Sequence, residues 1–275
     1  MTESIVSNLW NIQATHYARI ASSTIVLYDH LITLQEEVEL IWKACWSLVT
    51  ILFLMNRYYI LAALFFDLYV TFSPNITNTV RGQYFHWEGW TGLVAAILAQ
   101  GILQVRIYAL YSLNKKILAV MLICYFACSA VSAWMWTDLE ILIIIAVPIP
   151  GGKFCIPSRA ANFYSFWIPV LSFEFMLFFL AVFRGIGEYR LAGSSMFRGG
   201  RSLVGILIRD SVFYFLVIAV AYLISLLFWL SAPSGLVEAP VGYSPAMSCV
   251  LANRVLFNIR EGSRVRSPMF TSSET

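Results

Sequence analysis

The sequence predicts an all-α, polytopic membrane protein that folds as a seven-helix transmembrane bundle. Three observations predict this: 60% of the 275 residues are hydrophobic, only 12% are charged, and long apolar runs recur along the chain. Soluble domains average roughly 45–50% apolar and about 25% charged residues. A water-soluble fold of this size has too little polar surface to cover so many apolar side chains, whereas a bilayer removes that requirement.

Apolar runs near the length of a membrane span set the expected helices. Crossing about 30 Å of hydrocarbon takes about 20 apolar helical residues. A first span, at about 12–34, contains Arg19 and Asp29, so it can cross only if other helices shield its polar face. The stretch Ile141–Pro150 is too short and too rich in proline to cross, so we expect a structured outer loop there. The other spans are expected at about 46–66, 90–111, 117–136, 162–183, 211–230 and 241–257.

The basic residues predict the orientation of this bundle. Most of the 18 Lys and Arg residues fall on the side that holds residues 184–209 and 258–275. The positive-inside rule therefore predicts an extracellular N-terminus at residues 1–11, a membrane domain at 12–257 and a cytoplasmic tail at 258–275. In this topology Asn75, in the sequon Asn75-Ile76-Thr77, lies in the first outer loop and is a candidate glycosylation site. We expect a multi-pass protein of the plasma membrane or an endomembrane.

The longest inner loop, residues 184–209, combines five arginines with several glycines. It fits a flexible linker whose arginines lie against anionic membrane lipids. It also fits a docking loop for a cytoplasmic protein. The net charge of +3 is too small and too scattered to predict a nucleic-acid partner.

Two charged residues, Arg57 and Glu174, fall near mid-bilayer when depth is counted at about 1.5 Å per residue. Charges inside a membrane are costly and are enriched at functional sites. We therefore take Arg57 and Glu174 as a candidate intramembrane ion pair or ligand site. The alternative is a purely structural role for each residue.

A second candidate pair, Arg106 and Asp210, lies near the inner face. A contact between them that breaks when the sixth span moves would make an inner-face switch. The alternative is that both long side chains simply reach the headgroups.

Motifs for catalysis or cofactor binding are missing from the expected spans. The last span, 241–257, has no lysine for a retinal Schiff base. The three histidines fall at different depths and cannot converge on one metal ion, and no Ser/His/Asp set falls in one layer. We therefore expect a protein that is not an enzyme and holds no cofactor.

Several stretches share a pattern: Tyr28–Leu34, Glu37–Trp42, Phe53–Tyr58, Gly89-Trp90, Arg106–Tyr111, Arg209-Asp210, Tyr214-Phe215 and Asn258–Glu261. Taken together in order, these stretches resemble the fungal (basidiomycete) domain-of-unknown-function 6533 family of multi-pass membrane proteins. They run from residue 28 to residue 261, and the resemblance implies a seven-span membrane protein from a fungus but no activity.

These observations leave three functional hypotheses. The favoured one is a receptor-like sensor, with a small-molecule ligand near Arg57 and Glu174 and the basic inner loop as its output. The main alternative is a non-catalytic scaffold that binds membrane lipids or partner proteins. A transporter is less favoured, because the chain shows no internal repeat and an odd number of spans fits inverted repeats poorly.

Overall fold

The structure is a computed structural model that describes residues 2–73, 78–138, 144–149, 152–157, 163–192, 203–233 and 236–271. Within these ranges the chain is almost entirely helical, as predicted, with one short hairpin of strands. The helices are α1 (Thr2–Ile32), α2 (Leu34–Glu37), α3 (Leu48–Leu54), α4 (Ile60–Phe72), α5 (Asn78–Leu110), α6 (Lys115–Asp138), α7 (Trp167–Ala192), α8 (Leu203–Ser231) and α9 (Tyr243–Thr271).

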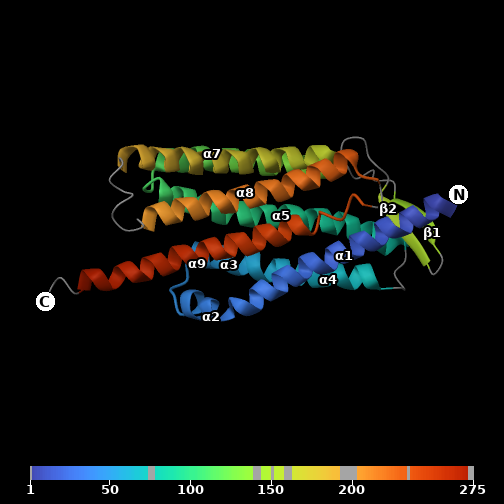
Figure 1. The fold of residues 1–275 in the computed structure, drawn as a ribbon, viewed down its shortest axis with the longest axis horizontal. Helices are drawn as coiled ribbons and strands as arrows, with labels where there is room; N and C mark the ends of the chain where they lie inside the picture. The colour runs from blue at the N-terminus through green and yellow to red at the C-terminus, as the bar shows by residue number, and fades with distance from the viewer. Residues whose placement is uncertain are drawn as a thin grey trace.

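Three short helical turns complete the helical part. Two are π-helical, η1 (Val38–Trp42) and η2 (Met55–Tyr59), and one is a 3₁₀ turn, η3 (Phe163–Phe166). Because α3, η2 and α4 follow one another without a break, they form one rod, and the described residues make seven long rods in all. The rods lie along one another in an elongated bundle, with the start of α1 at one end and α2 at the other (Figure 1).

The expected outer loop contains the hairpin. Strand β1 (Ile144–Ile149) pairs antiparallel with β2 (Gly152–Pro157), with Ile144 opposite Pro157. The hairpin lies at the same end of the bundle as the start of α1 (Figure 1). The prediction of a structured segment is thus confirmed over 144–149, while the all-α description needs this one correction.

The helix boundaries differ from the expected ones mainly at the ends. The first helix begins at Thr2, so residues 2–11 are helical, and α9 runs on to Thr271 through most of the expected tail. Five segments among the described residues are long and apolar enough to cross a membrane. These are Leu48–Phe72, His86–Leu110, Lys115–Thr137, Tyr164–Gly187 and Val212–Ser231.

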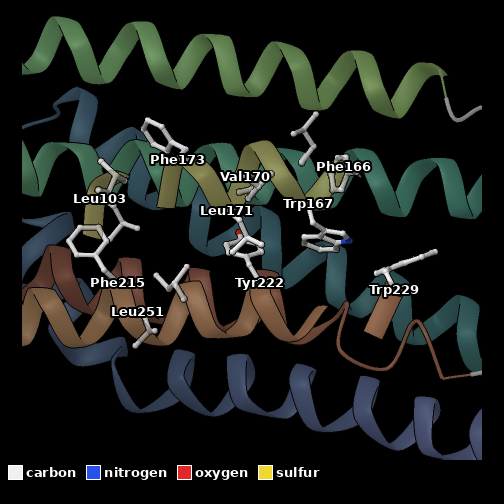
Figure 2. Close-up of a cluster of buried hydrophobic side chains, with 14 of the residues drawn as sticks. Leu103, Phe166, Trp167, Val170, Leu171, Phe173, Phe215, Tyr222, Trp229 and Leu251 are labelled. Carbon is white, nitrogen blue, oxygen red and sulfur yellow. The ribbon is translucent and has the colours of Figure 1, made fainter. Parts of the chain in front are cut away.

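The core lies between α5, α7, α8 and α9. Leu103, Phe173, Phe215 and Leu251, one from each of these helices, belong to one buried cluster (Figure 2). Toward the hairpin end the same cluster continues through a set of larger aromatic side chains, Phe166, Trp167, Tyr222 and Trp229. Helix α9 packs against α1 and α5 as well as α8, so it lies at the centre of the bundle.

Helices α5 and α6 pack closely at Gly89. A Cβ at this position would overlap the indole ring of Trp136, which is buried, whereas a Cβ at Gly92 would meet nothing within 4 Å. We expect Gly89→Ala to lower the free energy of unfolding by about 1–3 kcal/mol, because the tryptophan must move. Gly92→Ala, one turn away, is the matched control and should gain up to about 1 kcal/mol from helix propensity. Equal stability of the two variants in thermal melts would contradict this packing.

Candidate functional site

Arg57 is paired, but with a residue other than the expected one. The π-helical turn η2 places its guanidinium in the bundle interior, 2% exposed, with Nε 2.8 Å from the Glu37 Oε2 atom. Its Nη2 donates a hydrogen bond to the carbonyl oxygen of His30 at 2.9 Å. The proposed pairing of Arg57 with Glu174 is therefore wrong, because Glu37, at the end of α2, already occupies the cation.

The surroundings of this ion pair are closed and satisfied. The rings of Phe53 and Phe257 lie on the guanidinium, with its Cζ 5.7 and 5.8 Å from their centroids. The other Glu37 oxygen, Oε1, accepts hydrogen bonds from Trp42 Nε1 at 3.0 Å and Tyr58 Oη at 2.8 Å. Because the guanidinium of Arg57 and both oxygens of Glu37 have partners, the arrangement favours a structural role over a ligand site.

Helix α9 is tied to the same end of the bundle by further polar contacts. Arg254 binds Asp29 of α1, with Nη2 2.7 Å from Oδ1. Arg260 donates to the Leu40 carbonyl at 2.7 Å and to Thr50 Oγ1 at 2.6 Å. We call the Arg57–Glu37, Arg254–Asp29 and Arg260 contacts together the inner cluster.

Glu174 lies elsewhere, on α7, and is completely buried. Neither carboxyl oxygen has a hydrogen-bond partner among the described residues. The amide of Gln100 on α5 donates to the Val170 carbonyl, one turn before Glu174 on α7, at 3.4 Å. The carboxyl thus lies in the core, and no ion pair joins it to a cation of the part of the chain that the structure describes.

This environment gives an expected result for Glu174→Leu. A buried polar group without partners costs about 1–3 kcal/mol, and replacing it by an apolar side chain of similar size removes that cost. We expect the free energy of unfolding to stay unchanged or to rise by about 1 kcal/mol in SDS-titration experiments on micelle-solubilised protein. A loss above 2 kcal/mol would contradict this and would point to a bound group at this carboxyl.

The remaining predicted site residues are placed only in part. Arg106 is buried and holds its guanidinium 5.5 Å from the centroid of Tyr214 on α8. The side chain of Asp210, one turn earlier on α8, lies outside the described residues, so the Arg106–Asp210 switch stays a prediction. Asn75 also lies outside the described residues. Of the expected inner loop at 184–209, residues 184–192 continue α7 and residues 203–209 begin α8, so these parts are helical rather than a flexible linker. Arg184 donates from Nε to the Leu110 carbonyl at 3.2 Å.

One charge cluster, the largest among the described residues, was not predicted from the sequence. Arg19 of α1, 4% exposed, binds three carboxylates from three other parts of the chain. It donates to Asp67 of α4, and its Nη2 lies 3.0 Å from Glu88 Oε1 of α5 and 2.9 Å from Glu238 Oε2, in the turn before α9. The hydroxyl of Tyr84 accepts from Arg19 at 2.6 Å and donates to Asp67. We call these five residues the outer cluster.

The charges of the outer cluster do not balance. One guanidinium faces three carboxyl groups, and burial penalises each ionised carboxylate. For Glu238, in the turn, burial raises the pKa above its ordinary value, while Arg19 acts in the opposite direction. One of its oxygens, Oε1, is buried without a hydrogen-bond partner. The cluster therefore has spare capacity for a proton or another cation.

A partly open cavity adjoins the outer cluster. It has about 60 Å³ available to the centre of a water-sized molecule, which is room for several waters. Helices α4, α5, α7 and α8 contribute to its wall, and so do residues 241–245 around the start of α9. Asp67 and Glu88 supply its charges, while Trp87, Trp167 and Tyr222 supply aromatic rings. This cavity, rather than the region of Arg57 and Glu174, is the candidate ligand site.

Each member of the outer cluster gave only a weak signal on its own. Arg19 lies in the most polar expected span, and Asp67 and Glu88 lie at or beyond the expected ends of theirs. Glu238 lies in the loop that follows the sixth span. A sequence signal was nevertheless present, because buried arginine in a span requires acidic partners, and these acids fall at the same expected end of the bundle.

Comparison with known proteins gives one match. A search of curated proteins found no matching protein, and a search of solved structures found no matching structure. The model of the family of unknown function DUF6533 matches residues 17–62. This segment holds Arg19, Asp29, Glu37 and Arg57, so it supplies a residue to each ion pair described above. The match supports the resemblance to that family over α1, α2, α3 and η2.

Proposed function

We propose that this chain is a seven-span integral membrane protein that works as a receptor-like sensor, with its ligand in the cavity beside the outer cluster. Five apolar helices support the membrane location. The large hydrophobic side chains that the bundle leaves exposed on its helices, such as Ile123, Phe126 and Phe179, also support it, because lipid tails solvate such a surface.

The two less apolar rods, α1 and α9, also suit a membrane. The polar residues of α1 face inward, since Arg19, Ser22 and Asp29 are buried, while Trp10 and Tyr17 are exposed. Every position of α9 from 248 to 257 except Arg254 is buried. Because lipid contacts only the outside of a bundle, mean hydropathy understates how well these helices fit between the others.

The orientation follows from the basic residues and puts the cavity outside. The hairpin end of the bundle then faces the exterior, and the inner cluster lies on the cytoplasmic side. A C-terminal epitope tag should resist protease added to intact cells and be digested after permeabilisation. Digestion of the tag in intact cells would reverse the proposed orientation.

One observation carries the sensor function: α9 joins the cavity to the inner cluster. Its start lines the cavity at Ser244 and Pro245, and further along it holds Arg254 and Arg260 in contact with α1 and with residues of η1 and α3. A rigid helix with contacts at both ends can pass a displacement from one to the other. Ligand binding in the cavity is therefore proposed to change the inner cluster.

A cavity-filling substitution tests this coupling without knowledge of the ligand. Ala63 is buried and lines the cavity, whereas its neighbour Ala62 is exposed on the outside of the bundle. We expect Ala63→Leu, in the full chain in lipid nanodiscs, to change hydrogen–deuterium exchange several-fold at residues 38–47 and 254–261. Ala62→Leu adds the same atoms outside the cavity and should leave exchange there unchanged.

The opposite outcome would favour a different function. If Ala63→Leu changes exchange only around the cavity, the two ends of α9 are uncoupled and the sensor proposal fails. The chain would then fit the non-catalytic scaffold better, since such a protein needs a stable shape and no transmitted change.

A further inference from the structure

We propose that the cavity binds a small organic cation that carries a protonated amine. The ammonium group would lie on Asp67 and Glu88, and the alkyl part would lie against the apolar and aromatic wall. This inference rests on the proposed function, because it names the ligand class for the cavity assigned there.

The charge of the site selects a cation. Arg19 is shared among Asp67, Glu88 and Glu238, so the buried cluster carries more negative than positive charge whenever its carboxyl groups are ionised. Asp67 and Glu88 both line the cavity, and both also bind Arg19. A carboxylate has several acceptor positions and can bind a second donor while it keeps its arginine. An anionic ligand would instead be repelled.

The cavity wall selects an organic cation. Trp87, Trp167 and Tyr222 line it, and the faces of tryptophan and tyrosine rings attract ammonium groups. The remaining wall is largely aliphatic, as at Ile60 and Leu64, which suits a short hydrocarbon chain. With about 60 Å³ of space, the cavity fits an amine of a few heavy atoms rather than a large ligand.

One wall residue has an unused hydrogen-bonding group. Trp167 is 7% exposed, and its indole N–H has no acceptor among the described residues. Buried tryptophan N–H groups usually find a partner, so a free one in a side chain that lines a cavity points to a ligand or an ordered water. This observation is independent of the acidic residues.

The same wall disfavours a metal ion. Among the described residues, no group of three or more His, Cys, Asp or Glu side chains has the spacing to hold one. Calcium and magnesium need about six or more oxygen ligands, and two carboxylates with an apolar wall do not supply them. An ammonium group needs only a few hydrogen-bond acceptors, and aromatic faces can complete its coordination shell.

Isobutylammonium and its neutral isostere isobutanol form a matched pair of probes. We would measure their binding to the full chain in lipid nanodiscs by saturation-transfer NMR and by tryptophan fluorescence. The amine is expected to bind at least tenfold more tightly than the alcohol. Asp67→Asn and Glu88→Gln should each weaken amine binding by tenfold or more and leave alcohol binding within twofold. Glu88→Gln keeps the test usable if Asp67→Asn fails to fold.

Each contrary result has a distinct meaning. Equal binding of amine and alcohol, or amine binding that survives both substitutions, would overturn the amine inference. Binding of Na⁺ or Ca²⁺ alone at the site would overturn it in favour of a metal ion. If neither probe binds while Ala63→Leu still alters the inner cluster, the amine inference fails and the sensor proposal stands. If Ala63→Leu has no remote effect while the amine binds, the sensor proposal fails and the binding site stands.

Discussion

Replacing Glu37 by leucine is expected to lower the free energy of unfolding by about 3–5 kcal/mol, because Arg57 would remain buried without its counter-ion. Glu37 is fully buried, and Arg57 is 2% exposed. The substitution also removes the acceptor for the Trp42 and Tyr58 donors. SDS-titration of the solubilised protein, with helical circular dichroism as the signal, would measure the loss.

The matched control is the same substitution at the other fully buried carboxyl. Glu174→Leu changes the same atoms but strands no arginine, so the two variants should differ by several kcal/mol. The double variant Glu37→Leu/Arg57→Met removes both charges and should recover much of the loss. Similar losses for Glu37→Leu and Glu174→Leu would mean that the ion pair contributes nothing specific.

Arg19→Met is expected to have the second large effect, a loss of about 3–5 kcal/mol or failure to fold. The change leaves the buried Asp67 and the half-buried Glu88 and Glu238 together without a cation, and like charges in such a site repel strongly. The yield of monodisperse protein after solubilisation and its thermal melting would measure the effect. Lys115→Met, at an exposed lysine, is the control and should have almost no effect.

A second variant separates charge from packing at this site. If repulsion among the carboxylates causes the loss, Arg19→Met/Glu88→Gln should be more stable than Arg19→Met alone, because one charge is gone. If the double variant is less stable than the single one, the arginine acts through packing and hydrogen bonds instead.

The helices could be predicted from the sequence because each long apolar run has one simple solution in lipid. The runs at 46–66, 90–111 and 211–230 all coincide with helices, and the match at 17–62 supports the family resemblance. The seven-span topology and its orientation stay predictions. The hairpin and the extensions of α1 and α9 depend on contacts outside the apolar runs, which hydropathy does not register.

The partners of the charged residues were harder to predict. The depth of Arg57 follows from counting residues, but its direction around the helix does not. The π-helical turn η2 adds a residue to the turn that carries Arg57, so positions counted at about 3.6 residues per turn are rotated. Its partner Glu37 also lies in a short helix where the sequence indicated only a connection between spans. Partners on separate elements require the three-dimensional arrangement.

Helix α6 is less buried than the other four apolar segments. Only 11% of the most apolar 18-residue stretch of α6 is buried, and four of its large side chains are exposed: Val120, Ile123, Phe126 and Trp134. At a position that contacts only lipid, the side chain must be hydrophobic, but its shape is not constrained by packing. Substitutions among leucine, isoleucine, valine and phenylalanine at these positions should therefore hardly change stability. We expect the sequence of this helix to vary more freely in evolution than that of the buried helices.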